Sequence, residues 1–275
     1  MQHLKNLLVG TVVGDWTATA RDRLGLMYAA WSDPEKTGMI INDQLASLLV
    51  ASLCRPGRVL VDVGTHIGSM IDSAQRRSRA SKIVAIEAIP AKAAALRRKF
   101  PRVEVVECAV GEGGDREVTF FVDRVRSGFS SLARPMGRAD DIVEIKVQLR
   151  SLGEILAGHD VDVVKIDIEG AELGALRSAS EVLMACRPIV MFESGPGAGD
   201  RLGYSTSELW KFLDDLDFAV LTPNRLAHDD PGLSLDMFND SHLYPRRTTN
   251  YFAVPRQRRI EIRDLARTVL GIRVS

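Results

Sequence analysis

The sequence predicts an α/β fold built around a mostly parallel sheet, and three observations support this class. Residues 58–69, RVLVDVGTHIGS, predict a buried strand that runs into a glycine turn and the start of a helix. Residues 82–89, KIVAIEAI, predict a second buried strand with an acid near its end. Further along, apolar strand patterns alternate with helices of about ten residues, which is typical of right-handed βαβ units.

The first strand and its turn have the features of a site for a small polar cofactor. The apolar, β-branched residues of the strand suit a position that is covered on both faces, and Asp62 stands near the strand's end. Gly64 and Gly68 let the backbone turn tightly and approach a ligand, because a Cβ at either position would block that approach. The free N–H groups of the following helix face the same place.

An acidic residue at the end of the second strand indicates the kind of cofactor. Glu87 follows Gly64 by twenty-three residues, where a carboxylate can accept both ribose hydroxyls of a nucleoside. The turn lacks the third glycine of the dinucleotide fingerprint and has an acid, Asp62, before its first glycine. This pattern favours S-adenosylmethionine over NAD.

Length and composition favour one large domain with additions. The 275 residues are 45% hydrophobic, which is ample for a substantial core. Thirty-six basic and thirty-six acidic residues cancel, so no global charge favours nucleic acid or an anionic membrane, and the expected partner is a small or neutral molecule. Three cysteines, odd in number and far apart, predict reduced thiols and a cytoplasmic protein.

The N-terminus imitates a signal peptide, with Lys5, a short apolar run and small residues ending at Ala20. Gly10, Gly14 and Asp15 interrupt this segment, and the run is too short to span a bilayer. We therefore expect neither secretion nor an integral membrane segment. An amphipathic start that rests against a membrane or a partner stays open.

Residues 1–55 predict a helical extension that precedes the sheet. Apolar residues recur at helical spacing over residues 21–31 and 44–53, and Pro34 and Gly38 predict a break between these helices. We expect the extension to pack over the cofactor cleft.

The main domain is predicted over residues 56–255, where strands and helices alternate. Helices are predicted at residues 69–77, 91–100, 152–157, 170–184 and 207–216. Strands are predicted at residues 103–110, 161–168, 188–192, 218–221 and 249–254. This order predicts a parallel sheet with helices between successive strands.

Two segments interrupt the alternation. Residues 115–150 contain two β-rich runs, 117–123 and 143–149, without a helix between them, and so predict a β insertion. Residues 222–248 form a long polar loop, and loops of that length are usually functional or disordered. Residues 256–275 then predict a basic linker and a C-terminal helix.

The most specific string is residues 164–179, VKIDIEGAELGALRSA. It resembles the K-I-D-x-E-G-x-E element of the FkbM family of S-adenosylmethionine-dependent methyltransferases, through Lys165, Asp167, Glu169, Gly170 and Glu172. Further pieces match in order over residues 45–255, namely residues 62–68, Glu87 with Pro90, residues 109–111, residues 130–132, Phe192 with Glu193, and residues 250–255. One departure is His66, which stands where the family usually has asparagine.

The resemblance implies a class I methyltransferase with a Rossmann-like fold, in which a seven-stranded, mostly parallel sheet has an antiparallel last strand. It implies S-adenosylmethionine as the cofactor and a hydroxyl of a sugar, oligosaccharide, glycolipid or polyketide-like molecule as the methyl acceptor. Methyl transfer is an in-line displacement at a carbon activated by its sulfonium. The protein therefore has mainly to align the acceptor oxygen and remove its proton.

Candidate site residues follow from these patterns and from the resemblance. Those for the cofactor are Asp62, Gly64, His66, Gly68, Glu87, Ala109, Val110 and Asp167. Those for the acceptor are Ser130, Ser131 and Glu169. Those for proton removal are Asp167, Glu193 and His242, and Asp167 and Glu193 are also the candidate ligands of Mg²⁺. Asp167 and Glu193 end neighbouring predicted strands, so both carboxylates are expected at the cofactor edge of the sheet.

Several of these residues also have a purely structural interpretation. Asp167 can cap the next helix, Glu169 can stabilise a helix N-terminus through its dipole, and His242 can be a solvated surface histidine.

Three other functions stay open at this stage. A metal-dependent O-methyltransferase of a small natural product would lose activity on chelation. A non-catalytic nucleoside-binding module would bind the cofactor and transfer no methyl group. An NAD oxidoreductase would be recognised by cofactor titration. The identity of the acceptor and the formation of a homo-oligomer stay open as well.

Overall fold

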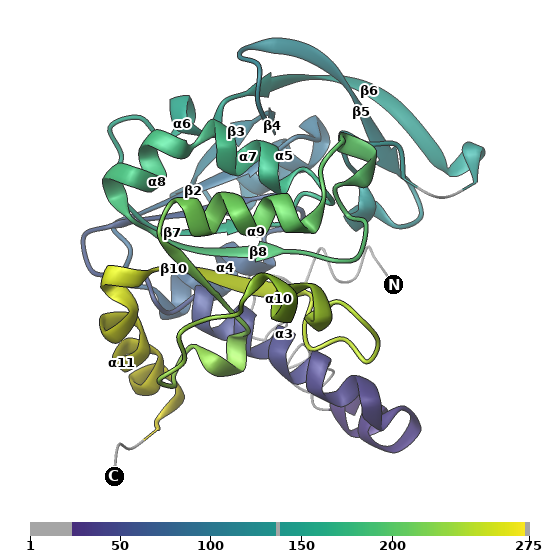
Figure 1. Cartoon of the computed structure of the whole chain (residues 1–275). Helices are drawn as coiled ribbons and strands as arrows, with labels where there is room; N and C mark the ends of the chain where they lie inside the picture. Colours follow the sequence, from purple (N-terminus) through teal and green to yellow (C-terminus); the bar gives the residue numbers. More distant parts are fainter. Residues whose placement is uncertain (1–23, 136–137, 273–275) are drawn as a thin grey trace.

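The computed structural model describes residues 24–135 and 138–272, and its centre is a seven-stranded sheet (Figure 1). The strands lie in the order β3-β2-β1-β7-β8-β10-β9. They are β1 (Val59–Val63), β2 (Lys82–Glu87), β3 (Glu104–Glu107), β7 (Val161–Ile166), β8 (Ile189–Glu193), β9 (Phe218–Leu221) and β10 (Asn250–Pro255). β10 is antiparallel to both of its neighbours. The other five adjacent strands, β3, β2, β1, β7 and β8, pair in parallel. The predicted mostly parallel sheet with an antiparallel last strand is confirmed.

The register of the sheet brings polar residues to one edge. β1 is buried along its whole length and pairs with β2 on one side and β7 on the other. In the pairing of β1 with β7, Asp62 lies opposite Lys165, and Glu193 at the end of β8 lies opposite Asn250 of β10. Because parallel strands end at the same edge of a sheet, the residues that follow β1, β2, β7 and β8 meet there.

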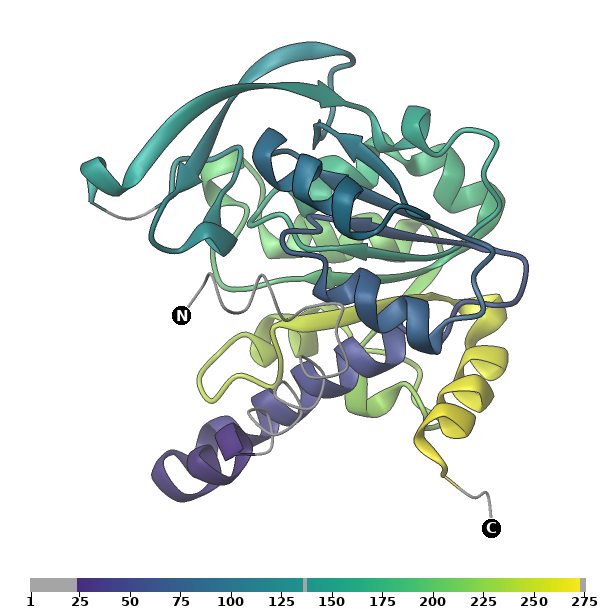
Figure 2. The same ribbon diagram turned by 180° about the vertical axis from the view of Figure 1, so that it is seen from behind.

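Helices cover both faces of the sheet. On one face, apolar residues pack against the sheet from α3 (Thr37–Val50), α4 (Ser69–Arg77), α5 (Pro90–Lys99) and α11 (Arg259–Leu270). On the other face lie α6 (Leu152–Ile155), α7 (Glu172–Ser178), α8 (Ser180–Cys186), α9 (Thr206–Asp215) and α10 (Leu235–Ser241). Figure 1 shows α7 and α9 on one side of the sheet and α3 and α11 on the other, and Figure 2 shows these layers from behind.

The predicted β insertion is present beside the main sheet. β5 (Arg116–Asp123) and β6 (Ile142–Arg150) pair antiparallel, and β4 (Ala109–Val110) adds a short third strand. Figure 1 shows this ribbon extending past the main sheet. The strand predicted at residues 103–110 needs correction, because β3 ends at Glu107 and the chain changes sheets after the buried Cys108.

Two further predictions are wrong in part. The helix predicted at residues 170–184 is two helices, because the backbone of Ala179 bends between α7 and α8, with φ −108° and ψ 11°. The polar loop predicted at residues 222–248 contains η5 (Pro223–Arg225) and α10, which begins where the side chain of Ser234 accepts a hydrogen bond from the backbone N–H of Met237. Phe238 of α10 is fully buried, so this segment belongs to the core.

The N-terminal extension is helical in its described part but is placed differently from the prediction. Residues 24–32 are helical, η1 (Pro34–Lys36) follows, and α3 runs through Gly38 without a break. α3 packs on the sheet through Ala46 and Leu49, and no residue of 24–55 lines the cleft described below. Residues 1–23 lie outside the described residues, so a covering role for them stays a prediction.

Short 3₁₀ helices complete the chain, namely η2 (Ser127–Phe129), η3 (Ala139–Asp141), η4 (Asp200–Leu202) and η6 (Arg256–Arg258). The C-terminal helix expected within residues 256–275 is present as α11. Within the two described ranges, no helix is both long and apolar enough to cross a membrane.

Candidate active site

The glycine turn after β1 is shaped by its contact with β7. Gly64 has φ +79°, and a Cβ there would overlap the backbone carbonyl oxygen of Asp167. Gly64 therefore lets the turn lie directly against the residue that follows β7, and it lines a cavity at this edge. Gly68 has a different role from the predicted one. A Cβ at Gly68 would overlap the ring of Phe100 beyond α5, so this glycine permits helix packing and does not line the cavity.

Lys165 links two acids beneath the cavity. Its Nζ lies 3.2 Å from Oδ1 of Asp62 and 3.3 Å from Oδ2 of Asp167, and it donates to the carbonyl oxygen of Gly64 at 3.0 Å. The two acids raise the pKa of the Lys165 ammonium, although burial opposes this effect. Asp62 is fully buried and does not line the cavity, which corrects its assignment as a direct cofactor ligand. It instead holds the cation that fixes Gly64 and Asp167.

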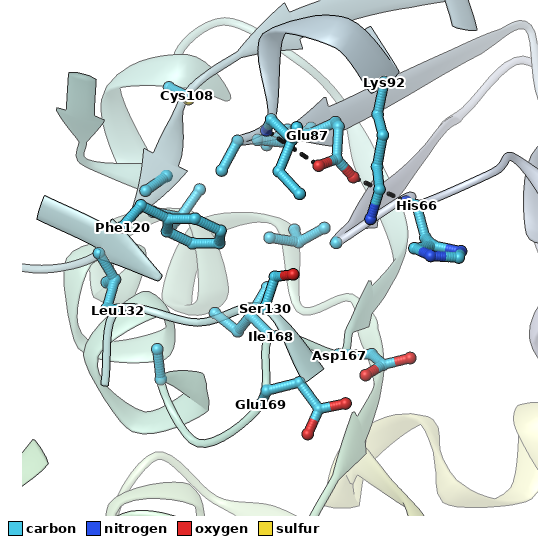
Figure 3. A pocket seen from close by; sticks show the side chains of 18 of the residues that line it. His66, Glu87, Lys92, Cys108, Phe120, Ser130, Leu132, Asp167, Ile168 and Glu169 are labelled. Atoms are coloured by element: carbon cyan, nitrogen blue, oxygen red, sulfur yellow. Dashed lines mark hydrogen bonds between the residues drawn. The ribbon is translucent and has the colours of Figure 1, made fainter. Parts of the chain in front are cut away.

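Glu87 faces the cavity from the end of β2 (Figure 3). Its Oε2 accepts a hydrogen bond from the backbone N–H of His66 at 2.8 Å, and its Oε1 accepts one from the backbone N–H of Ile89 at 2.9 Å. Each oxygen keeps a lone pair for a further donor. Burial raises the pKa of Glu87, and the ammonium of Lys92 opposes this rise. The predicted ribose acceptor is thus positioned at the cavity wall.

His66 lies in the left-handed region, with φ +54°, and also lines the cavity. Burial, together with Lys92 nearby, lowers the pKa of its imidazole to about 4. The ring is therefore neutral near pH 7 and offers one donor and one acceptor nitrogen.

The remaining walls of this cavity, which we call the cofactor cavity, are largely apolar. Ala109 and Val110, which the sequence predicted as cofactor contacts, lie in this wall. Phe120 and Leu132 line the cavity from the β insertion, and Ile168 lines it from the segment after β7 (Figure 3). The sequence did not predict these three residues as site residues, and its one signal is the alternation along β5, which suits an inward-facing Phe120.

Three carboxylates gather at the mouth of the cofactor cavity. Oxygens of Asp167, Glu169 and Glu193 all lie within 4.8 Å of one another. Asp167 follows β7 and Glu193 ends β8, so the predicted meeting of these two acids on neighbouring strands is observed. Glu169 joins them because its backbone is in the left-handed region, with φ +55°.

The three acids differ in charge. Lys165 lowers the pKa of Asp167, although burial opposes it, whereas burial and the neighbouring Asp167 raise the pKa of Glu193. Asp167 and Glu193 are hydrogen-bonded, so near neutral pH they hold one proton and one negative charge between them. Burial and Asp167 raise the pKa of Glu169 to about 7.

A second cavity of about 350 Å³ opens on the other side of these acids. Glu169 lines both cavities, Asp167 only the first and Glu193 only the second. The two predicted serines separate in the same way. Ser130 lines the cofactor cavity, whereas Ser131 lines the second and donates from Oγ to the carbonyl of Glu169 at 2.9 Å.

Glu172 holds the loop that carries Asp167 and Glu169. Its Oε1 accepts hydrogen bonds from the backbone N–H groups of Ile168 at 3.1 Å and Gly170 at 3.3 Å. Tyr204, which the sequence did not predict as a site residue, donates a hydrogen bond from its hydroxyl to the carbonyl oxygen of Gly170. Burial raises the pKa of Glu172 to about 7.

The structure places His242 beside Ser194, which follows β8, but in neither cavity. The imidazole is buried, with Nδ1 2.7 Å from the carbonyl oxygen of Phe238 and Nε2 3.0 Å from Oγ of Ser194. It packs between the rings of Phe238 and Tyr251 and lines neither cavity. Both nitrogens are engaged in the core, so the prediction of His242 as a catalytic base is corrected to a structural role.

Comparison with known proteins places the chain in a family. Residues 62–220, more than half of the 275, match the family described as Methyltransferase FkbM domain. No curated protein matches the sequence. Methyltransferase FkbM from Methylobacillus flagellatus KT is 15% identical, with a TM-score of 0.43 over 74% of this chain and 48% of that protein. The chain thus spans about half the length of that protein.

Two other solved structures are similar at low identity. A TehB-like SAM-dependent methyltransferase from Corynebacterium glutamicum is 11% identical, with a TM-score of 0.41 over 76% of this chain and 85% of that one. Precorrin-6y C5,15-methyltransferase from Geobacter metallireducens GS-15 is 16% identical, with a TM-score of 0.36 over 64% of this chain and 71% of that one.

The family match, the strand order with antiparallel β10 and the Gly64–Glu87 cavity agree with one another. The chain belongs to the FkbM family of S-adenosylmethionine-dependent methyltransferases.

Proposed function

We propose that this methyltransferase methylates a hydroxyl of a sugar, oligosaccharide or glycolipid-type acceptor. The observation that carries the proposal is the position of Asp167, Glu169 and Glu193 between the cofactor cavity and the second cavity. An alcohol is a poor nucleophile until its proton is removed, so an O-methyltransferase needs a proton acceptor or a metal at this junction. The carboxylates are suited to either role.

The cofactor cavity fits S-adenosylmethionine through its own groups. Gly64 lines the cavity and lets the turn after β1 lie against Asp167, and Glu87 keeps two acceptors for a ribose diol. The carboxylate of Asp167, 39% exposed, faces the same cavity and suits an ammonium group. When bound there, S-adenosylmethionine supplies a methyl carbon that its sulfonium activates for displacement.

The acid pair of Asp167 and Glu193 is the proposed proton acceptor. Lys165 keeps Asp167 ionised, and the proton on Glu193 leaves one negative charge on the pair. A hydroxyl that enters from the second cavity meets the carboxyl of Glu193, which is hydrogen-bonded to the ionised Asp167, with Ser131 and Glu169 beside it as hydrogen-bonding partners. The pair can then take up the hydroxyl proton as the oxygen is methylated.

A metal-assisted version is a second candidate, favoured by the three converging carboxylates. Oxygen ligands suit Mg²⁺, and Asp167, Glu169 and Glu193 are the described residues that would hold it. A divalent ion there would lower the pKa of an acceptor hydroxyl.

The test is formation of S-adenosylhomocysteine from S-adenosylmethionine with a panel of hydroxyl acceptors, in the presence and absence of EDTA. Acceptor-dependent turnover supports the O-methyltransferase, and its loss on chelation with recovery in Mg²⁺ selects the metal-assisted version. Tight binding of S-adenosylhomocysteine without turnover on any acceptor would instead indicate a nucleoside-binding module.

Two further proposals rest on composition. The balanced charge supports a small-molecule acceptor rather than nucleic acid, and the reduced cysteines support a cytoplasmic location.

A further inference from the structure

The second cavity is lined by both acids and arginines. The acids are Glu169, Glu172 and Glu193, and the arginines are Arg126, Arg201 and Arg246. The three arginines come from separate segments, namely the loop after β5, η4 and the segment before β10. Their convergence is a local feature, because the chain as a whole has no net charge.

Two of these arginines are held in position by the protein. Nη2 of Arg126 lies 3.2 Å from Oδ2 of the buried Asp123, and its guanidinium lies over the ring of Phe129 at 5.1 Å. Nη1 of Arg201 donates to the backbone carbonyl of Arg134 at 2.7 Å. A carbonyl oxygen orients a guanidinium without cancelling its charge, so Arg201 keeps a positive charge at the cavity wall.

Arg246 contacts no carboxylate within the described ranges. Its neighbour Arg247 is paired with Asp240 at 2.7 Å, but Arg246 itself makes no hydrogen bond or ion pair with the described residues. Arg201 and Arg246 therefore both present guanidinium donors that no carboxylate of residues 24–135 and 138–272 neutralises. A guanidinium matches the geometry of a phosphate or carboxylate through two parallel hydrogen bonds.

The cavity also has room for a ligand of this kind. The turn from Gly195 to Pro196 and Ala198 forms one wall without any long side chain. The volume of about 350 Å³ lies within the range of small-molecule sites.

We propose that the methyl acceptor is anionic and binds with a phosphate or carboxylate group against Arg201 and Arg246, beside Arg126. The inference rests on the proposed function, because it assigns the second cavity to the acceptor. The acceptor then lies with its anion against the arginines and its hydroxyl toward Glu193 and Glu169, which line the same cavity and whose carboxylate oxygens lie within 4.8 Å of those of Asp167. The same charge arrangement disfavours neutral sugars, which leave the guanidinium donors unpaired.

Binding of inorganic phosphate to the protein saturated with S-adenosylhomocysteine tests this inference independently of any turnover. We expect saturable binding in a calorimetric or phosphorus NMR titration, with acetate competing for the site. Arg201→Gln and Arg246→Gln should each weaken binding by roughly tenfold, because each removes a charge-assisted contact. Arg98→Gln, on an exposed position of α5 away from the cavity, is the matched control and should bind phosphate like the wild type.

Absence of saturable phosphate binding, or equal binding by the wild type and the Arg201→Gln/Arg246→Gln double variant, would overturn the inference. Thermal unfolding and S-adenosylhomocysteine affinity, measured on the same variants, establish that they are folded. Vesicles of phosphatidylglycerol, compared with phosphatidylcholine, separate the sources of the anion. Arginine-dependent binding to the former supports a lipid headgroup, whereas phosphate binding without vesicle binding supports a free anionic acceptor.

Matched acceptors separate failure of this inference from failure of the proposed function. Glucose 6-phosphate and glucuronic acid are compared with methyl glucoside in the S-adenosylhomocysteine assay. Turnover with the neutral sugar that equals turnover with its anionic partners would keep the O-methyltransferase and reject the anionic acceptor. Preferential turnover of an anionic member, reduced at least tenfold in kcat/KM by Arg246→Gln, would support both.

Discussion

The ammonium of Lys165 lies 3.2 Å from the buried carboxylate of Asp62, and the same Nζ lies 3.3 Å from Asp167. One cation thus joins the end of β1 to the residue after β7, at the place where the backbone of Gly64 passes. The Lys165–Asp62 pair is buried, so each charge is stabilised by the other. The position of Asp167 in turn depends on its contact with Lys165.

Lys165→Met is expected to destabilise the fold strongly. It leaves the Asp62 charge buried without a partner, a loss of about 3 to 5 kcal/mol in the free energy of unfolding. Urea denaturation followed by circular dichroism measures this. The double variant Lys165→Met/Asp62→Asn should recover much of the loss, because the unpaired charge is removed. A single variant within about 0.5 kcal/mol of the wild type would show that the pair does not hold this edge together.

Glu87→Ala is expected to weaken binding of S-adenosylhomocysteine. The change removes a carboxylate acceptor for the ribose diol, at a cost of roughly 1.5 to 3 kcal/mol. Isothermal calorimetry gives the affinity directly. Glu107→Ala, at the exposed end of the neighbouring strand β3, is the matched control and should bind like the wild type. Unchanged affinity of Glu87→Ala would remove this residue from the cofactor site.

Much of the site is predictable because it lies at the ends of strands. Gly64, Glu87 and Asp167 each follow or end a buried apolar run, and the parallel topology alone brings such positions together. Glu193 could be placed beside Asp167 for the same reason. Local sequence patterns are sufficient to predict these site residues, because each residue is positioned by the strand that it follows or ends.

The errors arise where a side chain's role depends on a distant partner. Gly68 lies in a sequence typical of a ligand-binding turn. The structure shows that a glycine is needed there because a Cβ would overlap the ring of Phe100. His242 lies in a polar stretch, and its burial depends on Phe238 and Tyr251 packing around it. The role proposed for Arg246 likewise depends on the other segments that line the same cavity, which its local sequence does not predict.

His242→Ala is expected to lower stability and leave the chemical step intact. The change opens a hole beside Phe238 and leaves Oγ of Ser194 without its imidazole partner, at a cost of about 2 kcal/mol or more. Denaturation and single-turnover methyl transfer, measured on the same preparation below its unfolding temperature, separate the two effects. His228→Ala, at an exposed position, serves as the control. A hundredfold loss of kcat with normal stability would contradict the structural role.

The free energy of unfolding is expected to contain a component from Glu172 that falls as the pH rises from 4.5 to about 7. Burial raises the pKa of this carboxyl from 4.5 to about 7 in the folded protein, so the native state binds its proton more tightly than the unfolded chain does. The resulting stability is present below pH 4.5 and is lost between pH 4.5 and about pH 7.

Glu172→Gln should remove this component, because an amide keeps the acceptor oxygen without titrating. We expect the difference in unfolding free energy between variant and wild type to shift in the variant's favour by about 2 to 3 kcal/mol from pH 4.5 to pH 8. Urea titrations at several pH values measure the shift. The comparison is made in a Glu169→Gln background, because the charge of Glu172 also raises the pKa of Glu169. Parallel pH profiles would show that Glu172 does not titrate in this range.

The acids between the two cavities are tested most directly by methyl transfer with an acceptor from the panel, using wild type, Asp167→Asn and Glu193→Gln. Both variants keep the size and hydrogen-bonding shape of the side chain, and S-adenosylhomocysteine affinity, measured in parallel, separates cofactor binding from turnover. We predict that each variant lowers kcat by roughly a hundredfold or more, because the proton acceptor or metal ligand is lost. Turnover equal to that of the wild type in both variants would contradict a role of these carboxylates in proton removal.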